Sequence, residues 1–235
     1  DNYKTVFPII KALKIPITIF INSYYLTSQR PYWHVELLYL IQALKKNKQS
    51  SQLATDDANF IEGKNLKEVW AYAVSQLIDL TFKERETILQ RFRAKATMAP
   101  LPRLSLNWKE CQEMEASGLV QFAPHSHSHP SMKALTEQEF KQEIVENVDE
   151  MKSRLTNPLL YFCYPYGHIN DNGHKWLKEC DMDAAFTTTP THTDSTTDPY
   201  LMPRIELSRQ CSVAHVKNKL NGHQQWMDKI KKKIR

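Results

Sequence analysis

The chain has 235 residues, 41% of them hydrophobic, which is enough to build the core of one sizeable α/β domain. No run of about 18 apolar residues occurs, so the sequence predicts no transmembrane segment. The formal net charge is +5, and basic residues gather in 228–235 without interleaved aromatic residues. This favours a solvated helix end over a nucleic-acid-binding strip, although an anionic glycan or phospholipid surface stays open as a partner.

The cysteines show no Cys-x-x-Cys spacing; they are Cys111, Cys163, Cys180 and Cys211. The sequence therefore predicts neither a zinc knuckle nor a disulfide framework, and it allows a reducing compartment without requiring one.

The first residues predict a helix and then a buried strand. Apolar residues follow helical spacing from Asn2 to Leu13, and Lys14-Ile15-Pro16 ends the helix. The run Ile17 to Ile21 is too short and too β-branched for a helix, so we expect a strand. Because the chain opens inside a helix, we expect its true start to lie upstream, and the lack of a visible signal peptide decides nothing.

Residues 28–100 predict a helical insertion between strands, placed where it would shape substrate access. We expect a loop from Tyr24 to Pro31 and then a helix from Tyr32 to Ile41, with Trp33 facing inward. A tryptophan in such a stripe is more often part of the core than a sugar platform.

The rest of this insertion is polar at first and then helical. Residues 45–64 have little pattern, and capped helix starts follow at Asn65 and Thr81. Asp56-Asp57 has the form of a catalytic pair, but it follows no strand and precedes no glycine. A helix cap or a solvated loop is the better interpretation of these two residues.

Three histidines stand at alternate positions between an apolar run and Pro130. The run Gly118 to Ala123 predicts a buried strand, and Thr136-Glu137-Gln138-Glu139 has the form of a capping box that opens the next helix. The histidines therefore lie on a loop at the carboxyl end of a strand, where α/β folds carry their chemistry.

The spacing of these histidines suggests a metal site. His125 and His129 are four residues apart, so a helical turn would point both imidazoles the same way, while His127 would point elsewhere. The alternative is a polar loop that is merely rich in histidine.

The C-terminal third repeats the alternation of strands and helices. The strand-like segments are Leu159 to Tyr164, Ala184 to Thr187 and Met202 to Leu207. Pro165-Tyr166-Gly167 turns sharply out of the first of them. Strands that alternate with helices predict a parallel sheet.

Several of these motifs resemble the polysaccharide deacetylases that share the chitooligosaccharide deacetylase homology domain, carbohydrate esterase family 4. Residues His125 to Pro130 fit the family's His-Ser/Thr-x-x-His motif, Tyr161 to Gly167 looks like its third motif, and Ile15 to Ile21 looks like its second strand. The order and spacing agree from Asp1 to Ile205, so the resemblance covers most of the chain outside the insertion.

The resemblance implies a fold and roles for individual residues. It implies one domain over 1–235, folded as a distorted, incomplete (β/α) barrel of about seven strands with the N-terminal strand missing. It assigns His125 and His129 to a divalent metal, with Zn²⁺ the expected ion. It assigns the Tyr166 backbone N–H to the oxyanion, with Pro165 and Gly167 fixing that turn at the substrate; without the histidines, the same turn would be a plain strand exit.

The departures from the family pattern concern the base, its partner and the acid. The first motif, Thr-Phe-Asp-Asp-Gly, supplies the base and the metal carboxylate and is absent, although Asp1-Asn2-Tyr3 looks like the segment just beyond it. Cys163 replaces the third-motif arginine, and Arg204 is a candidate substitute, with a structural ion pair as the alternative. The acid histidine has no clear counterpart, since His192 lies in a polar loop and His215 in an apparent helix.

The implied function is that of a metal-dependent hydrolase removing N-acetyl, less commonly O-acetyl, groups from a polysaccharide or oligosaccharide. The alternative is a non-catalytic glycan-binding relative that keeps the fold. The chain as given is expected to be a poor catalyst because it lacks the Asp-Asp motif. The sequence does not decide between a bacterial-type cytoplasmic and periplasmic location, nor does it specify the oligomeric state.

Overall fold

The computed structural model describes residues 2–49, 65–208 and 210–222. The helices are α1 (Phe7–Leu13), α2 (Ser23–Ser28), α3 (Trp33–Lys46), α5 (Leu66–Leu77), α6 (Phe82–Lys95), α7 (Trp108–Ala116), α8 (Glu137–Arg154), α9 (Gly173–Glu179) and α10 (Val213–Leu220). The strands are β1 (Ile17–Ile21), β2 (Val120–Pro124), β3 (Tyr161–Cys163) and β4 (Ala184–Phe186). Short π or 3-10 segments are η1 (Asn2–Val6), η3 (Met132–Ala134), η4 (Pro165–Gly167) and η5 (Pro199–Leu201).

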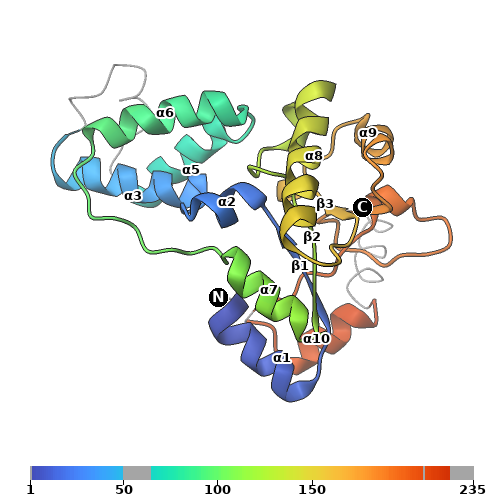
Figure 1. The fold of residues 1–235 in the computed structure, drawn as a ribbon. Coiled ribbons are helices and arrows are strands. Elements are labelled where there is room, and N and C mark those ends of the chain that lie inside the picture. Colours follow the sequence, from blue (N-terminus) through green and yellow to red (C-terminus); the bar gives the residue numbers. More distant parts are fainter. Residues whose placement is uncertain (1, 50–64, 209, 223–235) are drawn as a thin grey trace, which may run out of the picture.

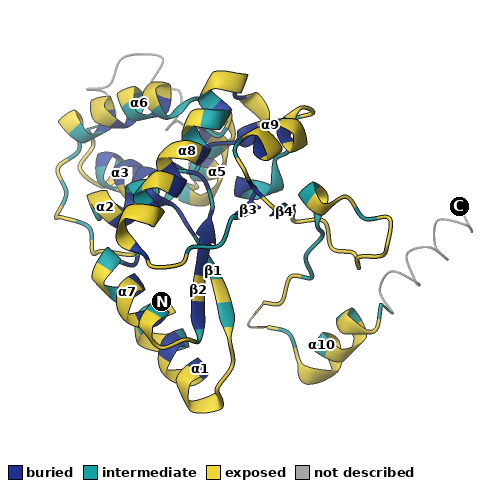
Figure 2. Ribbon diagram, turned by 45° about the vertical axis from the view of Figure 1, so that its right-hand side comes forward, coloured by how far each residue is buried: buried dark blue, intermediate teal, exposed yellow. Residues whose placement is uncertain are grey.

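The helices surround the strands, which run through the middle of the molecule (Figure 1). α3, α5 and α6 gather on one side of the strands, α8 and α9 on the other, and α1 and α7 lie together at one end. Figure 2 shows the buried residues concentrated on the strands and on the helix faces turned toward them, whereas α10 has no buried residue. The α/β class predicted from the sequence is confirmed.

The strands pair in parallel and follow one another in chain order. β1 pairs with β2, with Ile17 opposite Val120, and β3 pairs with β4. The Leu159 N–H donates to the Phe122 carbonyl over 2.8 Å, which places the start of the β3 segment beside β2. The described residues form two short two-stranded parallel sheets and no closed barrel, so they do not reach the expected count of about seven strands.

The expected strand from Met202 to Leu207 is wrong. Met202 makes a single bridge with Phe186, and no strand follows it. The next residue is Pro203, which has no N–H to continue a ladder of hydrogen bonds.

The expected loop from Tyr24 to Pro31 begins as a helix instead. α2 buries Ser23, Tyr25 and Leu26, and it ends at Gln29, which has a left-handed φ of 57°. The local pattern of polar and aromatic residues did not predict this helix, because the helix is stabilised by burial of one face against the rest of the protein.

The helix starts predicted from capping sequences are confirmed. Thr81 and Thr136 each form a capping box with the glutamate three residues later, and Asn65 caps α5 by accepting from the Lys67 N–H. Asn107 forms a further capping box at the start of α7. Each side-chain cap satisfies a backbone N–H that the helix leaves unpaired, and it contributes about 1 kcal/mol.

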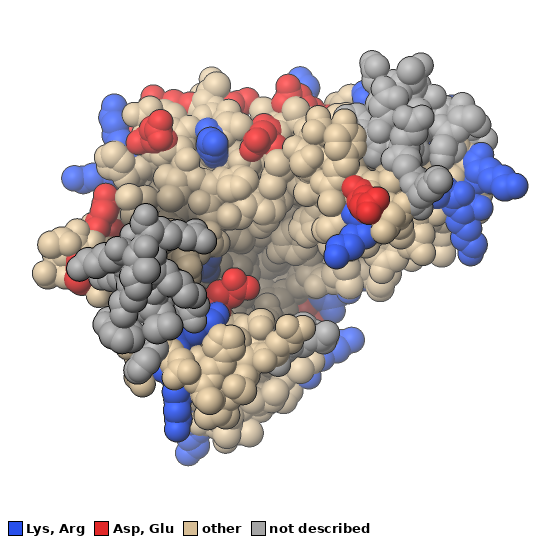
Figure 3. All heavy atoms as spheres, turned by 180° about the vertical axis from the view of Figure 1, so that it is seen from behind, with Lys and Arg blue, Asp and Glu red and all other residues tan. Residues whose placement is uncertain are grey.

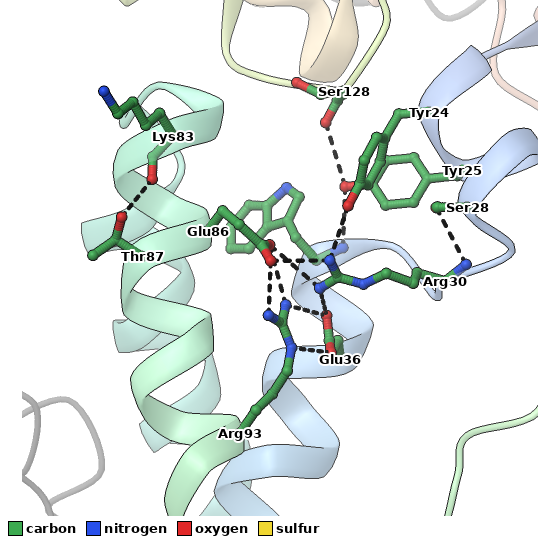
Figure 4. A network of polar contacts seen from close by, with 11 residues as sticks. Tyr24, Tyr25, Ser28, Arg30, Glu36, Lys83, Glu86, Thr87, Arg93 and Ser128 are labelled. Carbon is green, nitrogen blue, oxygen red and sulfur yellow. Dashed lines mark hydrogen bonds and ion pairs between the residues drawn. The ribbon is translucent and has the colours of Figure 1, made fainter.

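The helices of the 28–100 segment pack on one another around their own apolar cluster. Its buried members come from α3, α5 and α6: Trp33, Leu37, Leu40, Ile41, Leu44, Val69, Ala73, Leu77, Leu89 and Phe92. Four charged side chains join α3 to α6 (Figure 4). Arg30 and Arg93 both contact Glu36 and Glu86, with distances of 2.9 Å from Arg30 to each carboxylate and 2.6 Å from Arg93 Nε to Glu36.

Two predictions fall on parts of the chain outside the described residues, namely Asp56-Asp57 and the basic tail 228–235. The cysteines are described, and all four are free thiols. Among the described helices, none combines the length and the apolar character needed to cross a membrane.

Candidate active site

The histidine loop leaves the end of β2 and is held against the end of β1. The His125 N–H donates to the Ile21 carbonyl over 3.0 Å, which extends the parallel ladder by one residue. Ser126 and His129 then adopt left-handed φ values of 68° and 58°. The loop is thus an irregular turn and not the single helical turn expected, yet it still brings the first and last histidines together.

His125 is oriented by a backbone carbonyl. Its Nδ1 lies 2.6 Å from the Cys163 carbonyl oxygen, which can only accept, so Nδ1 carries the proton and donates it. Burial lowers the pKa of His125 to about 4, and the positive charge of Arg204 acts in the same direction. The ring is therefore neutral at physiological pH, and its Nε2 has a free lone pair.

His129 faces His125 with ring centroids 4.9 Å apart. Burial, followed by the neighbouring His125, holds the pKa of His129 well below its ordinary value. Its backbone N–H donates to Ser126 Oγ over 3.0 Å, and its Nδ1 is buried with no hydrogen-bond partner among the described residues. A buried ring nitrogen without a partner leaves capacity for a ligand.

His127 lies outside this pair. Its Nδ1 is 2.7 Å from Ser23 Oγ on α2, and its Nε2 is 3.8 Å from a Glu146 carboxylate oxygen on α8. The structure therefore brings together the two histidines that the spacing singled out and turns the middle one toward α2 and α8.

Two buried asparagines support the loop from behind. Asn22 donates to the carbonyls of His125 and Ser126, and Asn147 donates to the carbonyls of Ile21 and Ser126. Both asparagines are fully buried. Loss of the Asn22 amide would leave the His125 carbonyl without its donor, at a cost of about 1–3 kcal/mol, whereas the two carbonyls that Asn147 contacts each keep a second donor. The pattern of the sequence did not reveal these residues, because nothing local distinguishes them from loop or helix-surface asparagines.

The Pro165-Tyr166-Gly167 turn lies directly against the histidines. The Tyr166 ring centroid is 4.5 Å from that of His129, and its hydroxyl accepts from the Trp33 indole N–H over 2.9 Å. Tyr166 has a left-handed φ of 58°, and within the described residues its backbone N–H donates to no acceptor. Burial raises the pKa of Tyr166 to about 12, so the phenol is neutral. The turn thus presents an unpaired N–H beside the two imidazoles.

Gly167→Ala is expected to destabilise the fold more than Gly118→Ala. Both glycines have positive φ, 73° and 71°, so alanine strains the backbone by about 1–2 kcal/mol at either position. A Cβ at Gly167 would overlap Thr188 Oγ1, whereas at Gly118 it meets nothing within 4 Å. We expect about 1–3 kcal/mol of additional loss for Gly167→Ala, measured by urea unfolding. Equal losses for the two variants would contradict this packing argument.

Arg204 approaches the site from the segment after β4. Its Nε donates to the Thr187 carbonyl over 2.7 Å, and its guanidinium lies 6.0 Å from the centroid of the Phe20 ring. Burial raises the pKa of the Cys163 thiol to about 11, and the positive charge of Arg204 opposes that rise. Arg204 therefore lies near Cys163, the position at which the resemblance expects an arginine. Among the described residues Arg204 makes no ion pair with a carboxylate.

The other candidates for acid or base are engaged locally. His192 Nε2 lies 3.0 Å from the Leu220 carbonyl, and His215 lies on the exposed helix α10. The Asp194 carboxylate accepts from Thr196, and the Asp198 carboxylate accepts from the Tyr200 N–H. None of these side chains is placed beside His125 or His129 by the contacts that the structure records.

The histidine pair falls short of a complete metal site within the described residues, which contain no group of three His, Cys, Asp or Glu side chains able to hold an ion. Two neutral imidazoles that face each other suit Zn²⁺, but a structural or catalytic zinc normally has at least three protein ligands. The residues present therefore fit part of a zinc site.

A third histidine stands near the pair and was missed by the sequence analysis. The His34 ring centroid is 6.3 Å from that of His129, and its buried Nδ1 has no partner among the described residues. Burial lowers the pKa of His34. His34 is a single histidine at the start of a helix, and nothing in the neighbouring sequence indicates that its ring will approach the histidine loop.

A cavity of about 280 Å³ runs along β1, and neither His125 nor His129 is among its lining residues. Tyr32 lines it and also contacts His129, with ring centroids 5.6 Å apart. Other lining residues include Phe20, Arg103 and Ser105. Figure 3, which shows the molecule from behind, has a hollow near the middle of the face, with most Lys and Arg side chains at its outer edges.

The stability of the metal-free protein is expected to fall between pH 6.5 and about pH 4. His125 has a pKa of about 4 when folded and an ordinary value of 6.5, so in this window the unfolded chain binds the extra proton. Its contribution is complete above pH 6.5 and is lost, by up to about 3 kcal/mol, as the pH falls to about 4. Urea unfolding with a chelator at about pH 7.5 and about pH 4.5 measures this loss. A His125→Gln variant with the same pH dependence would contradict the assignment.

Residues 80–185 match the family model described as polysaccharide deacetylase, which confirms the resemblance found in the motifs. None of the curated proteins matches the chain significantly.

Three solved structures share the fold. A de-N-acetylase from Aggregatibacter actinomycetemcomitans aligns with a TM-score of 0.55 and 16% identity over 92% of this chain and 70% of that chain. IcaB from Ammonifex degensii aligns with a TM-score of 0.52 and 16% identity over 92% of this chain and 66% of that chain. The BpsB deacetylase domain from Bordetella bronchiseptica aligns with a TM-score of 0.51 and 14% identity over 87% of this chain and 66% of that chain. The chain thus spans 66 to 70% of the length of these structures.

Proposed function

Because residues 80–185 carry the polysaccharide deacetylase homology, we propose that the protein is a metal-dependent hydrolase that removes acetyl groups from a polysaccharide or oligosaccharide. The proposal rests on one observation: the rings of His125 and His129 face each other beside the Tyr166 turn, with their centroids 4.9 Å apart. Both histidines and the turn lie inside the matched stretch. We propose N-acetyl groups as the substrate, with O-acetyl groups as the alternative.

In this proposal His125 and His129 hold the metal. Both rings are neutral because of their burial, and the His125 Nδ1–H bond to Cys163 leaves Nε2 as the coordinating atom. Zn²⁺, when bound, would polarise the acetyl carbonyl and lower the pKa of a bound water toward about 7. The third ligand is expected to be a carboxylate of the kind that the family's Asp-Asp-Gly motif supplies.

The chain's own residues would stabilise and orient the substrate. The unpaired N–H of Tyr166 can donate to the carbonyl oxygen as negative charge develops there. Pro165 and Gly167 hold that N–H in place, since one has a fixed φ and the other a φ of 73° that tolerates no bulky side chain here. Arg204 has a guanidinium free of carboxylates among the described residues and could pair with a catalytic base.

The proposal is tested by acetate release from an N-acetylglucosamine oligomer, with Zn²⁺ added back to protein cleared of metal. Zinc-dependent release that Tyr166→Pro abolishes while Zn²⁺ binding is retained would support it, since proline removes the N–H. Retained Zn²⁺ binding is required because proline cannot adopt the φ of 58° that Tyr166 has, and it shows that the histidine pair survives the change in the turn. Tyr166→Phe is the matched control, because it keeps the N–H and loses only the hydroxyl. Release that is insensitive to chelators, or retained in Tyr166→Pro, would overturn the proposal.

A non-catalytic glycan-binding protein is the second candidate. It is favoured by one observation, the lack of a three-ligand metal group in the described residues. It predicts binding of the oligomer without acetate release at any zinc concentration. Isothermal titration alongside the acetate assay separates the two functions.

A further inference from the structure

Arg85, on α6 of the helical insertion, is an unusual buried cation. It is 1% exposed, and among the described residues it has no ion-pair partner. Its guanidinium donates to the carbonyls of Leu80 and Ser128 over 3.4 and 3.3 Å and stacks on the Trp33 ring at 4.8 Å. Burying a charge costs several kcal/mol, and apolar side chains of similar volume are often at least as stable. Stability alone therefore does not explain an arginine here.

The carbonyl that Arg85 contacts belongs to the residue just before His129. That Ser128 carbonyl also accepts from the buried Tyr25 hydroxyl over 3.3 Å, a contact drawn in Figure 4. On its other side, the Ser128 N–H and hydroxyl donate to the Glu143 carboxylate over 2.7 and 2.5 Å. Every polar group of Ser128 is thus fixed, and Arg85 is the one contact that comes from the insertion.

The stacked ring leads to the other half of the candidate site. The Trp33 indole N–H donates to the Tyr166 hydroxyl over 2.9 Å, and the Tyr166 ring lies 4.5 Å from His129. Arg85 on Trp33 therefore connects the histidine loop to the Tyr166 turn along a continuous path of direct contacts. Both contacts originate in the insertion, on α6 and α3.

We infer that Arg85 is a positioning residue, which together with Trp33 sets the placement of His129 relative to Tyr166 without touching the substrate. The inference rests on the proposed function for its effect on catalysis. It gives the helical insertion a role in the geometry of the site in addition to shaping access. A planar guanidinium is required, because it can bond two carbonyls and stack on an indole at the same time, and an ammonium cannot.

Arg93 offers a matched control on the same helix. It is a partly exposed arginine that pairs with Glu36 and Glu86 and touches neither motif loop in the contacts recorded. Arg85→Met and Arg93→Met both remove a guanidinium from α6 while keeping an unbranched stem. Only the first removes a contact to the histidine loop.

The test measures activity and metal binding on folded variants, with unfolding free energies as the reference. We expect Arg85→Met to lower kcat for acetate release and Co²⁺ affinity by about 10- to 100-fold with KM nearly unchanged, and Arg93→Met to alter each by less than about 3-fold. Arg85→Lys should not restore either property. Losses in Arg85→Met no larger than in Arg93→Met, or full rescue by lysine, would overturn the inference.

Amide hydrogen exchange keeps the inference separate from the proposed function. If the unaltered protein neither binds Co²⁺ nor releases acetate, the proposed function fails, yet exchange across 125–130 still reports the loop. We expect exchange there to quicken by about 10-fold or more in Arg85→Met and not in Arg93→Met. Unchanged exchange would overturn the positioning role. Should Arg85→Met fail to fold, Arg85→Lys and Trp33→Phe serve the same comparison. Trp33→Phe removes the indole N–H bond to Tyr166 together with part of the ring on which Arg85 stacks.

Discussion

Alanine at His125 or His129 is expected to lower Zn²⁺ affinity by more than about 100-fold, whereas His127→Ala should change it by less than about 3-fold. The two imidazoles whose rings face each other at 4.9 Å are the candidate ligands, and losing one leaves a single nitrogen. His127 instead contacts Ser23 and Glu146. Competition with a chromophoric chelator measures the three affinities under one set of conditions.

A weakened metal in His127→Ala with full binding in His129→Ala would show that the ligand assignment is wrong. His34→Ala is the informative fourth variant, because its ring lies 6.3 Å from His129 and its Nδ1 is free of partners among the described residues. A loss as large as that of His125→Ala would add His34 to the metal site. Retained affinity would leave it as part of the surrounding packing.

Adding an N-terminal Thr-Phe-Asp-Asp-Gly segment is expected to raise both zinc affinity and acetate release. The described residues place two imidazoles together but no carboxylate with them, so we expect weak metal binding and slow acetate release without the added segment. A general base commonly contributes about 10²- to 10⁴-fold in rate, and a third ligand strengthens the metal that polarises the carbonyl. The measurement compares zinc content and acetate release from an N-acetylglucosamine oligomer with and without the segment.

The matched control for that experiment carries Asn-Asn in place of Asp-Asp in the added segment. It should restore neither property, since it keeps the length and loses the carboxylates. Equal activity with and without the segment would mean that a carboxylate within the chain does the work. Asp194 and Asp198 are engaged in local hydrogen bonds, and Asp56 and Asp57 lie outside the described residues, so all four would then be replaced in turn.

The sequence by itself determined the features that depend on neighbours along the chain. The capping boxes at Thr81 and Thr136 start their helices where predicted, because a cap is satisfied within three residues. The β1 strand has the predicted limits, Ile17–Ile21, because the run after Pro16 is too short and too β-branched for a helix. Trp33 faces inward as expected from its helical stripe and is 3% exposed.

Only the tertiary structure decided how far the strands extend into a sheet. The alternation of strands and helices predicted a parallel sheet, and the family resemblance implied a barrel of about seven strands, but pairing depends on partners that local pattern does not reveal. β3 and β4 pair over three residues each, and Pro203 ends the next segment at one bridge. α2 formed where a loop was expected, since burial of Tyr25 and Leu26 stabilises it.

The site shows the same division between local pattern and distant contact. Four-residue spacing predicted that His125 and His129 would share a direction, but left-handed residues at Ser126 and His129, and not a helical turn, bring the rings together. The Cys163 carbonyl that orients His125 is 38 residues away, and Arg85 is 43 residues from Ser128. Contacts of that kind arise from packing of the whole chain, so the sequence indicated the chemistry of the site while the tertiary structure decided what holds it in place.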